Sequence, residues 1–380
     1  MFNVVRTEPR YHGAMELAIS HLVEHIRDAA AQARPLRIRG GGTKDFYGQN
    51  LVGEILDTRS LNQIIAYEPS ELVVTAGAGT ALQELEQLLA DQGQCLAFEP
   101  PHFGSGATVG GMVAAGLSGP AQCSVGPLRD YVLGVQMVNG QAQRLRFGGQ
   151  VMKNVAGYDV SRLMTGSLGI LGLITEVSLK VLPRAVAQAT LVFVLEQGPA
   201  LRQLAQWAAR PLPINASWWQ GDAAGGRLTI RLRGARAAVD AACRDLGGER
   251  QDDVRAQQDW QALREQTLGF FEPTAQDCLW RLSVPGSTEP IADLPSPCLL
   301  ECGGGVRWVK APASAMASLR TSASAVGGTA SIWRHPLAGE DRVADAFHPL
   351  ATGNLRIQRE LKRQFDPAGI FNPGRMFASF

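Results

Sequence analysis

The stretch RIRGGGTKDFYG, residues 37–48, places three consecutive glycines directly after a short strand-like run. Glycines at such a position let the backbone reach a positive φ, or let another group approach where a Cβ would clash. Successive N–H groups of a glycine turn can hold an anion, and Thr43 and Lys44 would add a hydroxyl group and a positive charge. The stretch therefore predicts either a phosphate-binding turn or an ordinary tight turn between two strands.

Two other kinds of phosphate-binding loop do not fit this stretch. A Rossmann loop leads directly into a helix, whereas GGGTKDFYGQN (40–50) has no helical period and reaches another strand-like run, GEILDT (53–58), within about ten residues. A P-loop needs a lysine followed by serine or threonine after its glycines, which GGTKDF (41–46) lacks. We therefore expect neither a Rossmann domain nor ATP binding.

A second glycine-rich tract, GSGATVGGMVAAG (104–116), favours the interpretation of the first as a phosphate-binding turn. Gly110 and Gly111 come just before a short apolar helical pattern. We expect free N–H groups and the positive end of a helix dipole to face a ligand over Gly106–Gly111. Two phosphate-sized sites suggest one ligand that contains a pyrophosphate.

The composition limits the possible classes of protein. With 380 residues, 45% of them hydrophobic, the chain can bury the cores of about two or three domains. A net charge of +1 favours neither nucleic acid nor an anionic membrane. Residues 1–13 lack a signal-peptide pattern, and the longest weakly polar run is too short to span a bilayer, so we expect a cytoplasmic protein. Six scattered cysteines without a CxxC pair argue against a zinc ribbon or an iron–sulfur cluster in this chain.

Periodicity predicts three segments. Residues 1–183 alternate helix and strand signals, with a hairpin at Asn139-Gly140. Residues 184–345 alternate strand-like runs with alanine-rich helical stretches, which indicates a second α+β domain with a mixed sheet. Within it, adjacent Trp218 and Trp219 must point to opposite faces of a strand, one toward the core and the other toward a rim or interface. Residues 346–380 contain a basic helix followed by a tail punctuated by proline and glycine.

Four stretches together resemble a known family. They are RIRGGGTK (37–44), GATVGGMVAAG (106–116), KNVAGYDVSRLMTGSLGILGLITEVSLKVLP (153–183) and FDPAGIFNPGRMF (365–377). In order and spacing they are similar to the FAD-binding fold of the vanillyl-alcohol oxidase and p-cresol methylhydroxylase (PCMH-type) family. More narrowly, they resemble the FAD-binding subunits of bacterial glycolate oxidase (glycolate dehydrogenase) complexes.

The resemblance implies an α+β protein with a two-lobed FAD domain, a smaller cap domain, and a C-terminal segment that packs back on the FAD domain. The two lobes would span about residues 1–95 and 96–183. It implies an oxidoreductase subunit that accepts electrons from glycolate or D-lactate on FAD. The electrons would pass to an iron–sulfur subunit, with a second flavin subunit in the same complex and quinone as the final acceptor. Membrane contact, at the inner membrane, would arise only through these partners. Relatives that tether FAD use a histidine or cysteine, which the first loop lacks, so noncovalent FAD is expected.

Matched position by position, the resemblance also implies the residues that hold FAD. The backbone at Gly40–Lys44 would bind the pyrophosphate, the tract Gly106–Gly111 would line the phosphate and ribose, the turn around Gly157 and Ser167 would contact the adenosine half, and Asn372 would approach the ring. The full expected set is Arg39, Gly40, Gly41, Gly42, Thr43, Lys44, Gly106, Ala107, Thr108, Val109, Gly110, Gly111, Gly157, Ser167, Gly169, Ile174 and Asn372.

The sequence does not identify a catalytic base. Related D-2-hydroxy-acid dehydrogenases carry a His-x-Gly-Asp-Gly-Asn-x-His stretch, and none of the six histidines here stands in such a setting. Arg334 and His335 are expected to face the surface, and we assign them no catalytic role. HLVEH (21–25) matches a zinc hydrolase pattern, but the apolar stripe of its helix would place both histidines on the solvated side, so no metal site is expected. Two alternatives to a dehydrogenase subunit therefore remain: an FAD-binding electron-relay or assembly subunit without catalysis of its own, and a freestanding oxidase.

Overall fold

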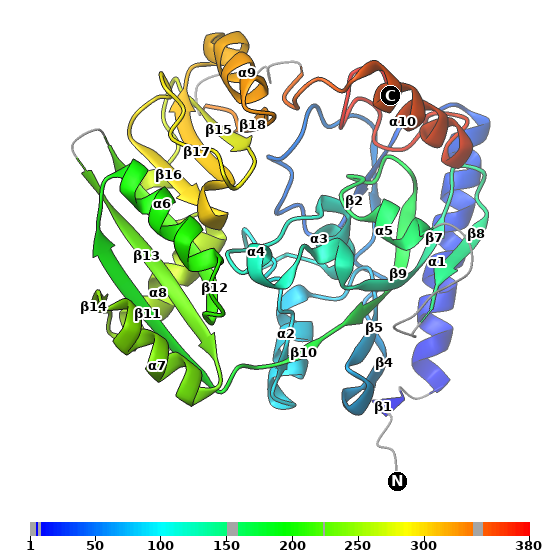
Figure 1. The fold of residues 1–380 in the computed structure, drawn as a ribbon. Helices are drawn as coiled ribbons and strands as arrows, with labels where there is room; N and C mark the ends of the chain where they lie inside the picture. The colour runs from blue at the N-terminus through cyan, green and yellow to red at the C-terminus, as the bar shows by residue number, and fades with distance from the viewer. Residues whose placement is uncertain (1–4, 7–8, 150–158, 223–224, 337–344) are drawn as a thin grey trace. The chain divides into compact units, whose positions relative to one another are not determined.

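A computed structural model describes residues 5–6, 9–149, 159–222, 225–336 and 345–380 (Figure 1). The chain divides into two compact units. The first unit comprises Met1–Ser118, Pro127–Arg184 and Pro349–Phe380, and the second comprises Gly119–Gly126 and Ala185–His348. The C-terminal segment therefore joins the first unit, as predicted. Residues Gly119–Gly126 belong to the second unit, which nothing in the sequence predicts.

The first unit is built on a six-stranded sheet in which all neighbouring strands are antiparallel. Its strands, in spatial order, are β1 (Val5–Arg6), β4 (Ile64–Glu68), β5 (Val73–Gly77), β9 (Leu173–Lys180), β7 (Val132–Val138) and β8 (Arg144–Gly148). The hairpin predicted at Asn139-Gly140 is confirmed, because it joins β7 to β8. The sheet takes strands from both sides of residue 95, so the two lobes do not separate at that point of the chain.

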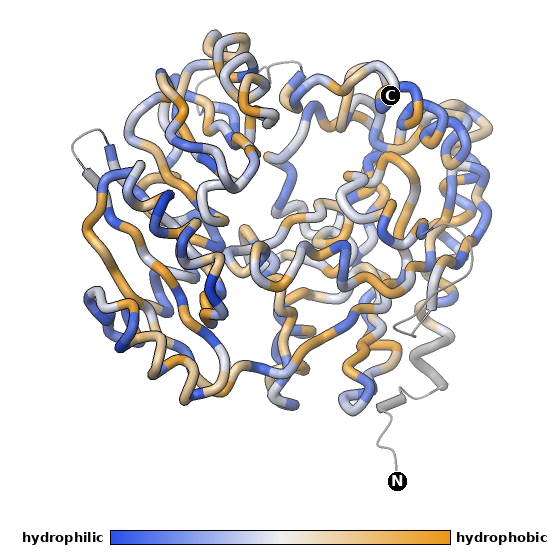
Figure 2. Tube along the Cα trace, viewed as in Figure 1, coloured by the Kyte–Doolittle hydropathy of each residue, from blue (hydrophilic) through white to orange (hydrophobic). Residues whose placement is uncertain are grey.

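Helices and short turns complete the first unit. They are α1 (Pro9–Ala31), α2 (Leu82–Asp91), α3 (Val109–Ala115), α5 (Val160–Met164) and α10 (Thr352–Phe365), with 3-10 turns η1 (Pro69–Glu71) and η2 (Leu128–Asp130). Leu22, Val23 and Ile26 of the α1 stripe are buried and His21 is exposed, as the pattern predicts, whereas Ile19 and His25 are half-buried. α10 carries mostly hydrophilic residues (Figure 2). Within the described ranges, no helix is both long and apolar enough to cross a bilayer.

A separate pair of parallel strands positions the first glycine loop. β2 (Leu36–Arg39) pairs with β3 (Glu54–Asp57), and Leu36 also forms a parallel bridge with Phe371 of the C-terminal tail. The glycines of residues 40–42 therefore leave the carboxyl end of a strand that lies between β3 and the tail. A second small pair, β6 (Gln94–Cys95) and β10 (Leu182–Pro183), is antiparallel.

The tail is held by buried polar contacts. Lys362 on α10 is paired with Asp366 at 2.6 Å, and its ammonium group also donates to the carbonyls of Ile170 and Phe371, both at 2.8 Å. The side chains of Lys362 and Asp366 are 7% and 0% exposed. A buried ion pair is tolerated only when hydrogen bonds satisfy the remaining charge, which this arrangement does.

The second unit contains an eight-stranded sheet with antiparallel pairing throughout, so the expectation of a mixed sheet is wrong. In spatial order its strands are β14 (Glu249–Arg250), β11 (Ala187–Val194), β13 (Gly225–Gly234), β12 (Ile214–Asp222), β16 (Cys298–Glu301), β17 (Val306–Ala311), β15 (Cys278–Ser283) and β18 (Thr329–Arg334). Its helices are α4 (Gln122–Val125), α6 (Gln197–Ala208), α7 (Arg236–Leu246), α8 (Asp253–Glu265) and α9 (Met316–Ala325), with turns η3 (Gly269–Phe271), η4 (Cys302–Gly304) and η5 (Ala313–Ala315).

The two faces of this sheet differ in character. Helices α6, α7 and α9 cover one face, where they form a single apolar core with alternate strand residues, including Trp219 and Trp280. The opposite face, called here the polar face, packs against α8, whose Trp260 donates its indole N–H to Thr190. Trp218 lies on the polar face and is 9% exposed. The prediction that the two neighbouring tryptophans point to opposite faces is confirmed, although Trp218 is buried.

The N-cap of α8 offers a local test of this unit. The carboxylate of Asp252 accepts hydrogen bonds from the N–H groups of Val254 and Arg255 at 3.1 and 3.0 Å. Asp252→Ala should lower the free energy of unfolding by about 1 kcal/mol, since it leaves these two donors without a cap. Chemical denaturation measures the change. Gln258→Ala, at an exposed position of the same helix, is the control and should be neutral; equal stability of the two variants would contradict the capping role.

Candidate functional site

The two glycine tracts lie directly against each other. A Cβ built on Gly41 would stand 1.5 Å from the carbonyl oxygen of Gly106, and one built on Gly40 would stand 2.3 Å from Thr108 Oγ1. No real side chain tolerates such distances, so the loops can meet only because these positions are glycines. Gly42 also needs to be glycine, because its φ is +72°. The structure thus brings together two tracts that the sequence separates by more than sixty residues.

Where the tracts meet, the backbone N–H groups are available to a ligand. Among the described residues, none accepts a hydrogen bond from the N–H groups of Gly41, Gly42 or Thr43. The same holds for Ser105 and Gly106. A cluster of such N–H groups is what an anion-binding nest requires.

Charged side chains surround the first loop. Asp45 accepts hydrogen bonds from Arg37 and Arg39, at 2.5 and 2.9 Å, and this pairing fixes both guanidinium groups beside the loop. Lys44 Nζ donates to the carbonyl of His102 at 3.3 Å and lies 5.7 Å from the ring centroid of Phe103. The ammonium group of the first loop is therefore held at the start of the second tract. The sequence analysis missed Asp45, although two arginines at strand spacing call for a nearby carboxylate.

The start of α3 differs from expectation. Its first three N–H groups are all paired within the protein: Val109 with the Thr80 carbonyl, Gly110 with the Ala78 carbonyl, and Gly111 with the hydroxyl oxygen of the N-cap Thr108. The expectation of free N–H groups at this helix end is therefore wrong. The close fit has a clear cause, because a Cβ on Gly110 would stand 2.6 Å from that of Ala78. Gly110 is needed for the close packing of α3 against Ala78. Any ligand contact of residues 109–111 would involve atoms other than their backbone N–H groups.

A third group of expected residues adjoins the same strand end. Asn372 accepts a hydrogen bond from the backbone N–H of Ile38 at 2.7 Å and donates to the carbonyl of Leu168 at 2.6 Å. Gly169, with φ +75°, leaves room for that amide. Asn372 thus ties the tail to β2 and to the turn after α5.

Ser167 supplies an unpaired buried group in this turn. The residue is 5% exposed, and its hydroxyl oxygen has no hydrogen-bond partner among the described residues. A buried hydroxyl group without a partner costs free energy unless a ligand or water satisfies it. Ile174 is buried on β9, and Gly157 lies outside the described residues.

The structure shows the surroundings of His102, His25, Arg334 and His335. His102 Nε2 lies 3.0 Å from a carboxylate oxygen of Glu86, and His25 Nε2 lies 3.3 Å from Glu54. Arg334 is partly buried, and burial lowers its pKa. Both ring nitrogens of His335 are buried. The expectation that Arg334 and His335 form a surface-facing pair is therefore wrong.

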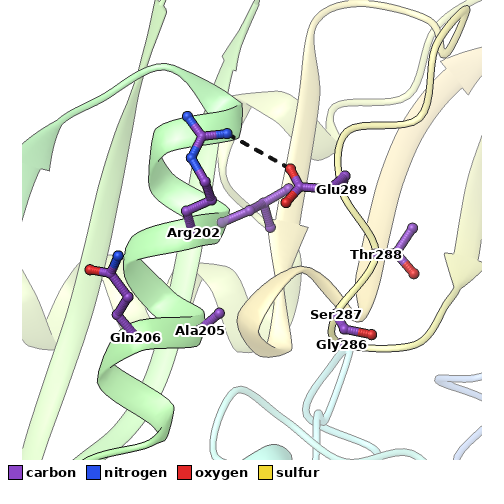
Figure 3. A pocket seen from close by; sticks show the side chains of 8 residues that line it. Arg202, Ala205, Gln206, Gly286, Ser287, Thr288 and Glu289 are labelled. Carbon is purple, nitrogen blue, oxygen red and sulfur yellow. Dashed lines mark ion pairs between the residues drawn. The ribbon is translucent and has the colours of Figure 1, made fainter.

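Two hollows are formed elsewhere. One, of about 220 Å³, lies between α6 and residues 286–289 of the second unit, where Arg202 and Glu289 form an ion pair at 3.8 Å (Figure 3). The other, of about 500 Å³, lies between α10 and the last residues of the chain. Neither is lined by a residue of the glycine loops.

These observations fit the pyrophosphate-containing cofactor that the resemblance implies. Unused N–H groups, a lysine beside them and an unpaired buried serine hydroxyl lie at one end of β2 and its neighbours. Expected residues of the stretches 37–44, 106–116 and 365–377, with Gly169 of the stretch 153–183, thereby lie close together in the first unit, even though the first three N–H groups of α3 are paired.

Comparisons with known proteins agree with this description. Residues 18–148 match a family model described as an FAD binding domain. The glycolate oxidase subunit GlcE of Escherichia coli (strain K12) is 44% identical over 94% of this chain and 97% of its own length. GlcD, a glycolate oxidase subunit of Bacillus subtilis, is 32% identical over 44% of this chain and 36% of its own. A D-lactate dehydrogenase of Archaeoglobus fulgidus is 32% identical over 42% and 36%, respectively.

The fold has a solved counterpart. An alkyldihydroxyacetonephosphate synthase superposes with a TM-score of 0.62 over 93% of this chain and 74% of its own, at 16% sequence identity. At this identity the likeness concerns the fold alone.

Proposed function

The chain belongs to the GlcE family of glycolate oxidase subunits, and from this membership we propose that it is the FAD-binding subunit of a complex that oxidises glycolate or a related 2-hydroxy acid such as D-lactate. The observation that carries the proposal is the contact between the two glycine tracts, where the N–H groups of Gly41, Gly42, Thr43, Ser105 and Gly106 have no acceptor among the described residues. When bound, FAD supplies a two-electron acceptor for the oxidation. The chain's own contribution is to hold that cofactor and orient it.

Each part of the site would hold a different part of FAD. The N–H groups of residues 40–44 and the Lys44 ammonium group would bind the pyrophosphate, with Gly106 and its neighbours beside it. The unpaired hydroxyl group of Ser167 would bind the adenosine half together with Gly157, Gly169 and Ile174. Asn372 would approach the flavin ring. Because the first loop has neither histidine nor cysteine, and because the His102 ring is paired with Glu86, the binding would be noncovalent.

The electrons would leave through partner subunits. The six cysteines are free thiols without the spacing of a cluster motif, so the chain would depend on an iron–sulfur subunit and a second flavin subunit, with quinone as the final acceptor. Such a complex would be cytoplasmic and would reach the inner membrane through those partners.

A second function is favoured by one feature of the sequence. None of the six histidines stands in the metal-binding stretch of the related D-2-hydroxy-acid dehydrogenases. The chain would then bind FAD without oxidising substrate, and would serve as an electron relay or as an assembly subunit of the same complex.

An absorption spectrum without oxygen distinguishes the two. If the chain oxidises substrate, adding glycolate or D-lactate to the purified protein should bleach its visible flavin absorption within the mixing time. Flavin bands that persist with substrate, yet bleach with dithionite, would support the relay or assembly function. Protein that carries no FAD after reconstitution would contradict both functions.

A further inference from the structure

The polar face of the second unit brings an acid and a cation to one tryptophan. Arg281 on β15 lies directly opposite Trp308 on β17 in the strand register. Trp280 and Leu282, the neighbours of Arg281 along the strand, belong to the apolar core on the other side of the sheet. Because side chains alternate along a strand, Arg281 points away from that core. Glu301, at the end of β16, points to the same face.

Glu301 and Arg281 both contact Trp308 but do not contact each other. Trp308 donates its indole N–H to Glu301 Oε1 at 2.6 Å, and the guanidinium carbon of Arg281 lies 5.9 Å from the centroid of the Trp308 ring. Arg281 donates one hydrogen bond to Ser283 Oγ at 2.9 Å. Within the described part of the chain, no carboxylate lies at ion-pair distance from Arg281. Glu301 and Arg281 therefore flank one indole ring without pairing with each other.

The state of Glu301 is unusual for a carboxyl group. Burial raises its pKa to about 7, while the hydrogen bond from Trp308 and the charge of Arg281 act in the opposite direction. Near neutral pH the group can therefore either donate or accept a hydrogen bond, as a group that handles a hydroxyl proton must. Strongly shifted carboxyl groups beside a specific charge are typical of ligand sites.

A second donor beside Glu301 also lacks a partner. Trp218 on β12 lies directly opposite Glu301 in the register. It is 9% exposed, and its buried indole nitrogen has no hydrogen-bond partner among the described residues. A buried donor without a partner costs free energy unless a ligand or water accepts its hydrogen bond. The polar face thus holds more hydrogen-bonding capacity than its own residues use.

Two thiols complete the surroundings of Glu301. Cys123 on α4 is exposed and forms a hydrogen bond with Cys302 of η4, which lowers the pKa of Cys123. The charge of Glu301 raises the pKa of both thiols, and the charge of Arg281 acts on Glu301. An alkylating reagent at Cys123 can therefore report on events at Glu301.

We propose that Arg281 and Glu301 form a binding site for a small 2-hydroxy carboxylate, in which the Arg281 guanidinium pairs with the ligand carboxylate and the Glu301 carboxyl group hydrogen-bonds the 2-hydroxyl group. The ligand class rests on the proposed function, whereas the site itself rests on the contacts above. A guanidinium group is the side chain best suited to a carboxylate, which it can bind through two parallel hydrogen bonds.

The pH dependence follows from the charges. Protonated Glu301 donates a hydrogen bond and does not repel an anionic ligand, whereas ionised Glu301 does repel it. Affinity should therefore be highest below pH 7 and should fall as the pH rises through about 7. The Cys123 and Cys302 thiols, which also face Glu301, would weaken binding further only where they ionise.

Calorimetric titration of the purified protein with glycolate, without oxygen and with any bound flavin already reduced by dithionite, tests the site apart from any redox reaction. The probe that lacks the hydroxyl group is acetate, which should bind more weakly. Arg281→Gln should lower glycolate affinity by about tenfold or more, since it removes a charged hydrogen bond, and Arg281→Lys should lose less. Glu301→Gln should keep binding but abolish its pH dependence. Arg202→Gln, in the hollow of Figure 3, is the matched control and should bind as the wild type does.

The outcomes separate this site from the proposed function. Binding that depends on Arg281 supports the site even if glycolate does not reduce the flavin. Glycolate binding that is unchanged in a folded Arg281→Gln protein overturns the site, even if the flavin is reduced. Slower alkylation of Cys123 in the presence of glycolate would be independent support, and an unchanged alkylation rate in a protein that shows no calorimetric signal would also overturn the site.

Discussion

Gly41→Val should yield a folded protein that has lost most of its FAD. The new Cβ would stand 1.5 Å from the Gly106 carbonyl oxygen and 2.4 Å from its carbon, so the two glycine tracts would have to separate. Loss of two N–H contacts to a charged pyrophosphate corresponds to about 3 kcal/mol, or an affinity about 100-fold lower. The ratio of visible flavin absorption to protein absorption, followed by reconstitution with increasing FAD, measures the loss.

Two further variants show whether a loss of FAD in Gly41→Val comes from the site itself and not from general misfolding. Gly13→Ala on α1 is the matched control, because a Cβ there meets nothing within 4 Å, and it should keep its FAD. Lys44→Met adds no atoms to the contact between the tracts and should lower FAD affinity about tenfold through the lost charge. Stoichiometric FAD in purified Gly41→Val would show that the contact between the tracts is not the pyrophosphate site.

Lys362→Met should be the most destabilising single change in the C-terminal segment. It removes the cation that pairs with Asp366, a fully buried carboxylate, and it leaves the carbonyls of Ile170 and Phe371 without their donor. Removing one partner of a buried ion pair costs about 3–5 kcal/mol. Denaturant unfolding, monitored by circular dichroism, should show a loss of this size.

The comparison variants isolate the buried charge as the cause. Arg363→Met alters the next residue of the same helix, whose side chain is 73% exposed, and should change stability by less than about 0.5 kcal/mol. The double change Lys362→Met with Asp366→Asn removes the uncompensated charge but keeps an acceptor for the N–H groups of Ile370 and Phe371. It should therefore recover part of the loss. Equal stability of Lys362→Met and Arg363→Met would contradict the role of the pair.

The sequence predicted those features that depend on local chemistry. Backbone freedom explains the close approach of another segment to the glycines of residues 40–42 and the hairpin at Asn139-Gly140. Strand geometry explains why Trp218 and Trp219 point to opposite faces. The family resemblance added the return of the tail to the first unit. The residues expected to bind FAD also converge in space, although their contacts with the cofactor stay predictions.

What the sequence could not reveal depends on partners far along the chain. The N–H groups at the start of α3 are used by the Ala78 and Thr80 carbonyls, which no spacing rule relates to Gly110. In the same way, Thr80 and Gln83 have the spacing of a capping box at the start of α2. In the structure, however, Thr80 hydrogen-bonds the backbone of Gln63 and does not cap α2. The raised pKa of Glu301 arises from burial on a sheet face whose register becomes apparent only in three dimensions.

The position of the tail also has a consequence for how the chain is made. The hydrogen bond between Ile38 and Asn372 joins residues 334 apart, and those between Arg375 and the carbonyls of Gln49 and Lys44 span 326 and 331 residues. During synthesis, β2 and its glycine loop leave the ribosome long before their neighbouring strand exists, and the whole second unit is translated in between. Contacts of such separation form late and slow the folding of a domain. The tail can therefore join β2 and its glycine loop only after the whole second unit has been translated, and a chain that stops short of residue 371 would leave an otherwise finished second unit attached to an open first one.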